Sequence, residues 1–133
     1  MPNVGFEQNS LNKDMTVALA GGGLELFKTK GTILLQAKVI GDHPLAFGPE
    51  DISRIFTYED NQWVEINDLV TYGNIGHIVI SPDDLNPTID LFVRPDLSDR
   101  SFPIRVRIFV FAHIYDGSIT KNMVTAYVDL YLR

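Results

Sequence analysis

The sequence contains no cysteine, and its 133 residues include only 11 basic side chains against 17 acidic ones. The absence of cysteine excludes disulfide frameworks, zinc ribbons, iron–sulfur ligation and thiol catalysis. The formal charge of −6 disfavours sequence-independent binding of nucleic acid, which needs an excess of lysine and arginine. No apolar run approaches the roughly 18–20 residues of a membrane span. These absences predict a soluble, acidic protein with one domain of ordinary size.

The N-terminal segment lacks the features of a targeting signal. Residues 1–8 contain no basic stretch followed by an apolar run, and we therefore do not expect them to be a secretory signal peptide. We therefore expect a cytoplasmic protein, although a mature secreted form without its signal would look the same. Because residues 1–13 are polar with isolated apolar positions, we predict a flexible N-terminal arm or lead-in there. A single β-sandwich domain is expected over residues 14–133.

The dominant periodicity of the remaining chain is two residues, which is the period of a β-strand. Alternating or β-branched runs predict strands at residues 15–20, 24–28, 32–40, 52–58, 63–66, 77–81, 88–94, 103–115 and 122–133. No window shows a sustained helical period. We therefore predict an all-β fold, an antiparallel β-sandwich of about eight or nine strands with an immunoglobulin-like or jelly-roll topology. A closed β-barrel is the alternative.

The last two predicted strands also restrict their own register. Apolar residues occupy the even positions of both strands, so the two apolar faces align only if paired residue numbers sum to an even number. A two-residue turn at Asp116 and Gly117 would give an odd sum, and we therefore predict a loop of three or five residues. Either loop places Asp129 opposite Arg105 or Arg107, which is a stabilising pair of opposite charges.

The odd-numbered face of this hairpin combines large aromatic side chains with guanidinium groups. We call it the aromatic–arginine face, and it contains Arg105, Arg107, Phe109, Phe111, His113, Tyr115, Met123, Tyr127 and Tyr131. An exposed patch of this composition is unusual on a monomer. Three interpretations are open: the chain's own loops or N-terminal arm cover the face, it is a subunit interface, or it is a platform on which sugars or bases stack. Binding of single-stranded nucleic acid is disfavoured by the negative charge of the whole protein.

Acidic residues are concentrated in the middle of the chain. Residues 42–99 contain twelve acidic side chains and two basic ones, a net charge of −10. The simplest explanation is that aspartate begins turns, in which this stretch is rich. The functional alternatives are head-to-tail association between an acidic and a basic end, and calcium binding by loop carboxylates. The calcium candidates are Asp83, Asp84, Asp90, Asp96 and Asp99, but no EF-hand pattern is present, and we expect no cofactor.

Motifs of the common enzyme classes are missing from the sequence. The three histidines, His43, His77 and His113, lie on separate segments without a His-x-His pair, so a zinc site is not expected. There is no Gly-x-Ser-x-Gly motif, and the glycine triplet at 21–23 precedes a strand-like run where a phosphate-binding loop would precede a helix. Trp63 directly follows a predicted turn, where we expect it to pack in the hairpin or the core.

The sequence therefore favours a non-enzymatic association module. We expect a homo-oligomer, or a domain that binds a macromolecular partner, with the aromatic–arginine face as the contact surface. The first alternative is a carbohydrate-binding or calcium-dependent lectin-like domain. The second is a small β-fold enzyme that uses carboxylate or histidine chemistry.

Overall fold

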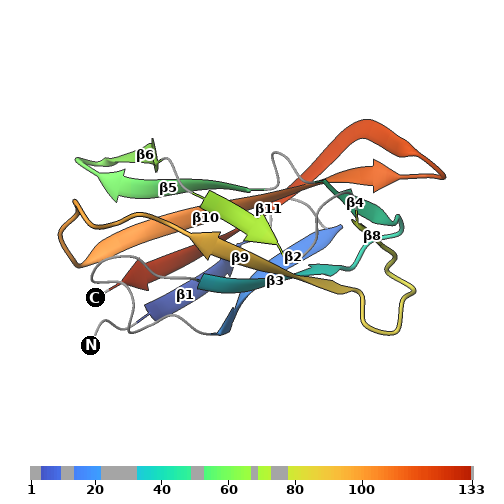
Figure 1. The fold of residues 1–133 in the computed structure, drawn as a ribbon, viewed down its shortest axis with the longest axis horizontal. Helices are drawn as coiled ribbons and strands as arrows, with labels where there is room; N and C mark the ends of the chain where they lie inside the picture. The colour runs from blue at the N-terminus through green and yellow to red at the C-terminus, as the bar shows by residue number, and fades with distance from the viewer. Residues whose placement is uncertain are drawn as a thin grey trace.

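A computed structural model of the chain describes residues 4–9, 14–21, 33–48, 53–66, 69–72 and 78–132. These residues form eleven strands and no helix, arranged in two antiparallel sheets, which confirms the predicted all-β sandwich (Figure 1). The larger sheet contains β1 (Val4–Asn9), β4 (Leu45–Phe47), β5 (Ser53–Glu59), β6 (Gln62–Ile66), β8 (Ile78–Ile80), β10 (Ile104–Tyr115) and β11 (Ile119–Leu132). The smaller sheet contains β2 (Met15–Gly21), β3 (Ile33–Val39), β7 (Leu69–Tyr72) and β9 (Thr88–Arg94).

The long strand β10 organises the larger sheet. Along one edge it pairs with β11, which in turn pairs with β1. Two strands share its other edge: β5 pairs with residues 106–110 and β4 with residues 113–114, and these are followed outwards by β6 and β8. The smaller sheet has the order β2-β3-β9-β7. The described strands of each sheet follow one another from one edge strand to another without closing on themselves. The sandwich is therefore open, and the closed barrel considered above is not formed.

One hydrophobic core fills the space between the two sheets. The even-numbered positions from Ile104 to Ala112 in β10 and from Val124 to Leu132 in β11 are buried in it, as the alternation predicted. The odd-numbered positions of β3 and β9 face them from the smaller sheet. The largest fully buried side chains are Phe47, Met15, Ile33, Leu35, Leu45, Ile55, Leu91, Leu97, Ile108, Leu130 and Leu132. Each such side chain contributes about 1.5–3 kcal/mol on burial, so this core is the main source of stability.

Eight of the predicted strands are present in the described residues. They correspond to β2, β3, β5, β6, β8, β9, β10 and β11, while the predicted run at 24–28 lies outside the described residues. Three further strands, β1, β4 and β7, were not predicted. β4 and β7 have only three and four residues and no alternation that stands out from the sequence, and β1 lies in the polar segment where an arm was predicted.

Both predicted hairpins are formed. Asp60 and Asn61 make the tight turn between β5 and β6 with φ angles of 51° and 65°, as a type I′ turn requires. In the last hairpin Tyr115 pairs with Ile119 across a three-residue loop, and a bulge between residues 113 and 115 then shifts the register. The predicted even sums hold on both sides of this bulge, and Asp129 lies opposite Arg107.

The N-terminal segment contributes to the larger sheet. Residues 4–9, where we predicted an arm or a lead-in, form strand β1 and pair with residues 127–132 of β11. Backbone hydrogen bonds to an exposed strand edge do not depend on apolar side chains, so the polar composition of this segment does not prevent pairing. The described residues include no helix that is long and apolar enough to cross a lipid bilayer.

Candidate interaction face

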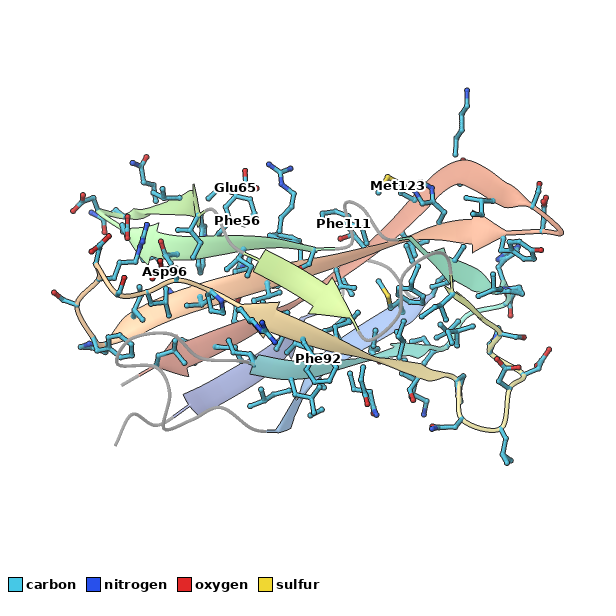
Figure 2. The ribbon with its side chains drawn as sticks, in the orientation of Figure 1. Phe56, Glu65, Phe92, Asp96, Phe111 and Met123 are labelled. Atoms are coloured by element: carbon cyan, nitrogen blue, oxygen red, sulfur yellow. The ribbon has the colours of Figure 1, made fainter. Side chains whose placement is uncertain are left out.

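The outer side of the larger sheet carries the aromatic–arginine face, and β5 and β6 extend it. Phe56 of β5 lies opposite Arg107 of β10, and Trp63 of β6 lies opposite Tyr58 of β5. Because opposite residues of antiparallel strands share a face, Phe56, Tyr58 and Trp63 join the predicted residues on this side. Figure 2 shows Phe56 and Phe111 on the upper side of the sheet. The sequence predicted the hairpin that carries the three rings but gave no sign that it pairs with β10.

Phe109 is the centre of an aromatic cluster on this face. Its ring lies edge-on to that of Phe56, with centroids 5.5 Å apart, and is tilted against Tyr127 at 5.3 Å. It is stacked with Phe111 at 6.4 Å. Offset and edge-on ring pairs of this kind each add about 0.5–1.5 kcal/mol beyond the burial of area. The cluster therefore half-buries its own members and holds them in fixed orientations.

Arg107 and Asp129 form a bidentate ion pair beneath the rings. The Nε of Arg107 donates to Oδ1 of Asp129 at 2.7 Å, and its Nη2 donates to Oδ2 at 2.9 Å. Asp129 is only 3% exposed although it lies on the outer face. The guanidinium also lies 4.3 Å from the ring centroid of Trp63 and 4.5 Å from that of Tyr127. The hydrogen bonds to Asp129 raise the pKa of Arg107 above its ordinary value, so this cation is fixed in place and fully charged.

A second bidentate pair lies further out on the same face. Nε of Arg54 donates to Oε2 of Glu65 at 2.7 Å, and Nη2 donates to Oε1 at 2.6 Å, with both side chains exposed. The hydrogen bonds from Arg54 hold the pKa of the Glu65 carboxyl below its ordinary value. Two of the three arginines on the described face therefore have carboxylate partners within the face itself.

Arg105 is the exception among these arginines. Its guanidinium lies 5.2–5.4 Å from the ring centroids of Tyr58, Trp63 and Tyr131. No carboxylate of the described residues forms an ion pair with it. An open hollow of about 310 Å³ lies beside it, at the low end of the range for ligand sites, lined by Tyr58, Pro103, Ile104, Arg105 and Tyr131.

The remaining predicted residues lie at the opposite end of the hairpin. Nδ1 of His113 donates to the carbonyl oxygen of Thr120 at 3.0 Å, since a carbonyl can only accept. Tyr115 lies past the bulge, and its backbone N–H donates to the carbonyl oxygen of Pro44. Met123 is 49% exposed. The structure thus brings the arginines and most of the rings together in one cluster, and these three residues extend the face beyond it.

The described strands form only the two sheets, and no third layer of them lies over this face. The N-terminal arm, one of the covers considered above, lies as β1 beside β11 at the edge of the sheet. Tyr58 and Met123 are exposed on the face. No described strand therefore covers the rings, which pack against one another and against the guanidinium groups.

The calcium candidates are spread over three places. Asp83 and Asp84 lie in the connection between β8 and β9, Asp90 in β9, and Asp96 and Asp99 in the connection between β9 and β10. The carboxylate of Asp84 accepts the N–H of Ser81, and that of Asp96 accepts the N–H and hydroxyl of Ser98. These are turn-capping contacts of the kind that aspartate commonly makes.

The described residues contain no group of three or more histidine, aspartate or glutamate side chains placed to hold a metal ion. His43 is exposed in the connection between β3 and β4, which leads into the pairing of β4 with β10 at residues 113–114. His77 lies outside the described residues.

Comparison of the chain with known protein families, with curated proteins and with solved structures found no match. Any function must therefore be argued from the geometry of the molecule.

Proposed function

We propose that this protein is a non-enzymatic association module that self-assembles through the outer face of its larger sheet. The observation that carries the proposal is the cluster of rings and guanidinium groups on a sheet face that no other described strand covers. Aromatic residues, methionine and arginine are enriched in protein interfaces, and they dominate the energy of binding there.

The positions of the guanidinium groups favour a protein partner over a stacked sugar. A sugar or base that stacks on an aromatic ring needs an open ring face. Arg107 lies over the rings of Trp63 and Tyr127, and Arg105 lies over that of Tyr131. Occupied ring faces support the idea that these side chains form a preorganised contact surface, since rigid groups lose little conformational entropy when they bind.

The charge balance of the face favours a second copy of the chain as the partner. Arg54 is neutralised by Glu65 and Arg107 by Asp129, so the centre of the face presents little net charge. The whole protein has a formal charge of −6, so two copies repel each other on average. A neutral, aromatic centre does not add to this repulsion.

The test is the molar mass in solution, measured by light scattering, of the parent and of two variants. Phe111→Asp and Met123→Asp place a charge on the proposed contact surface, and we expect each to weaken association and so lower the mass measured at a given concentration. Met123 is half-exposed, so its replacement leaves the fold intact. Phe92→Asp is the matched control, because Phe92 is an exposed aromatic residue on the smaller sheet (Figure 2); it should keep the parental mass.

A parent that stays monomeric at about 100 µM overturns self-association, because interfaces of standard size bind well below that concentration. An oligomeric parent whose face variants remain folded and keep their mass shows that association occurs elsewhere on the molecule. Circular dichroism of each variant establishes that it is folded.

A further inference from the structure

The hollow beside Arg105 joins a cation to apolar and aromatic walls. Tyr58, Pro103, Ile104 and Tyr131 supply the walls, and the guanidinium of Arg105 lies at their margin. Arg105 is exposed and is paired with no described carboxylate. Such a site fits an apolar side chain that has a carboxylate next to it, since the apolar group fills the hollow and the carboxylate binds the guanidinium.

The connection between β8 and β9 presents that combination. Leu85 has a relative exposure of 105%, so its whole side chain is in water. Asp83 and Asp84 precede it directly. The carboxylate of Asp84 is used to accept the N–H of Ser81, whereas that of Asp83 is exposed and has no partner among the described residues. We call this connection between β8 and β9 the tip. It carries the exposed side chain of Leu85 and the unpaired carboxylate of Asp83.

The tip is also held in a fixed conformation. The N–H of Asp84 donates to the carbonyl oxygen of Ser81 at 3.1 Å, which closes a turn with Pro82 in its second position. On the other side, the carbonyl oxygen of Pro87 accepts the N–H of Val39 at 2.9 Å, which anchors the connection to β3. A single exposed leucine is ordinary on a protein surface. Because this connection is anchored at both ends, Leu85 loses little conformational entropy when it inserts into a hollow.

The tip and the hollow lie at opposite ends of the long axis of the molecule. In Figure 1 the yellow connection between β8 and β9 reaches one end. The beginning of β10 and the end of β11, which carry Arg105 and Tyr131, lie at the other. Within one chain the two surfaces therefore cannot meet, but each is available to another copy.

We propose that Leu85 of one copy inserts into the hollow of the next, with Asp83 paired to Arg105, so that copies associate head to tail. This inference rests on the proposed self-association and names the contact that directs it. A contact between two different surfaces of the same chain does not close on itself in a dimer, and it leads to rings or open chains. Because the two contact surfaces lie at opposite ends of the long axis, we expect open chains, and the mass of the parent should rise continuously with concentration.

Glu59, which follows the wall residue Tyr58 in the sequence, is paired with Arg100 at 2.7 Å, and Asp96 caps the turn at Ser98. Neither forms an ion pair with Arg105 in the described structure. Charges further away are screened beyond about 8 Å at physiological ionic strength. The local pair of Asp83 and Arg105 can therefore form although each copy is acidic overall.

The experiment uses two variants that each disable one surface. Leu85→Asp removes the apolar group of the tip and leaves the hollow intact, and Arg105→Glu reverses the charge at the hollow and leaves the tip intact. We expect each variant alone to associate at least about tenfold more weakly than the parent. Because Leu85 is wholly exposed, its replacement does not disturb the core. Phe92→Asp is again the control that should behave as the parent does.

An equimolar mixture of the two variants gives the decisive result. The intact tip of Arg105→Glu fits the intact hollow of Leu85→Asp, so mixing restores the one contact that each variant lacks on its own. We therefore expect the mixture to reach a larger mass than either variant alone at the same total concentration. A mixture that is no larger than the separate variants overturns the head-to-tail contact. If Leu85→Asp keeps the parental mass while Phe111→Asp does not, the head-to-tail contact is wrong and association through the face stands. A parent that is monomeric refutes the association itself.

Discussion

Breaking the ion pair between Arg107 and Asp129 should destabilise the fold more than breaking the similar pair of Arg54 and Glu65. The geometry of the two pairs is nearly the same, with donor–acceptor distances of 2.7 and 2.9 Å in the first and 2.7 and 2.6 Å in the second. They differ in burial: the side chain of Asp129 is 4% exposed and that of Glu65 is 43% exposed. The comparison therefore isolates the effect of burial.

The expected magnitude follows from what each substitution leaves behind. Arg107→Met leaves the carboxylate of Asp129 buried without a cation, and breaking a fully buried pair in this way removes about 3–5 kcal/mol of unfolding free energy. Because the side chain of Arg107 is 23% exposed, water partly replaces it, and we expect a loss of about 2–3 kcal/mol. Asp129→Asn keeps one neutral acceptor, the amide oxygen, for the guanidinium and should lose about 1–2 kcal/mol.

The assay is urea unfolding followed by circular dichroism, with all variants at one protein concentration because self-association adds to the apparent stability. The double variant Arg107→Met/Asp129→Asn should lose less than the sum of the single losses, since it removes both charges together. Arg54→Met serves as the exposed control and should shift the midpoint only slightly. Equal shifts for Arg54→Met and Arg107→Met, or full additivity in the double variant, would refute the argument from burial.

Two further predictions concern single side chains of β5 and β6. The hydroxyl of Thr57 is buried with no hydrogen-bond partner in the described structure, so Thr57→Val should raise the free energy of unfolding by about 1 kcal/mol, and a lower urea midpoint would contradict this. Because hydrogen bonds from Arg54 lower the pKa of Glu65, the pair stabilises the fold fully above the unfolded pKa of a glutamate, and this contribution disappears as the pH falls through the lower, folded pKa. An NMR titration should show the pKa of Glu65 rising towards its ordinary value in Arg54→Met, and an unchanged pKa would show that Arg54 is not its cause.

Much of the fold could be predicted from local patterns. Alternation in residues 88–94 and 103–115 predicted β9 and β10 to within a residue, because a sandwich buries one face of every strand and the side-chain period of a strand is two. The short strands β4 and β7 carry three and four residues and left no such pattern. They form because β10 and β9 offer free edges to the backbone, which is a property of the assembled sheet.

The candidate site was predicted only in part, for the same reason. The composition of β10 and β11 identified the aromatic–arginine face, but the contribution of Phe56, Tyr58 and Trp63 depends on the pairing of β5 with β10. These two strands are separated by more than forty residues in sequence, and no local pattern specifies which distant edge a hairpin joins. The hollow at Arg105 follows from this pairing, since Tyr58 forms one of its walls.

The sequence by itself determined which side of the last hairpin is buried and that Asp129 faces an arginine. Both follow from parity, because side chains alternate strictly along a strand and the even positions are apolar. Only the tertiary structure decided that the arginine is Arg107, since the choice depends on the bulge between residues 113 and 115, next to the contact of β10 with β4. Tertiary structure alone also made Asp129 a buried residue on an outer face, because the rings and guanidinium that shield it come from strands that meet only in the folded sheet.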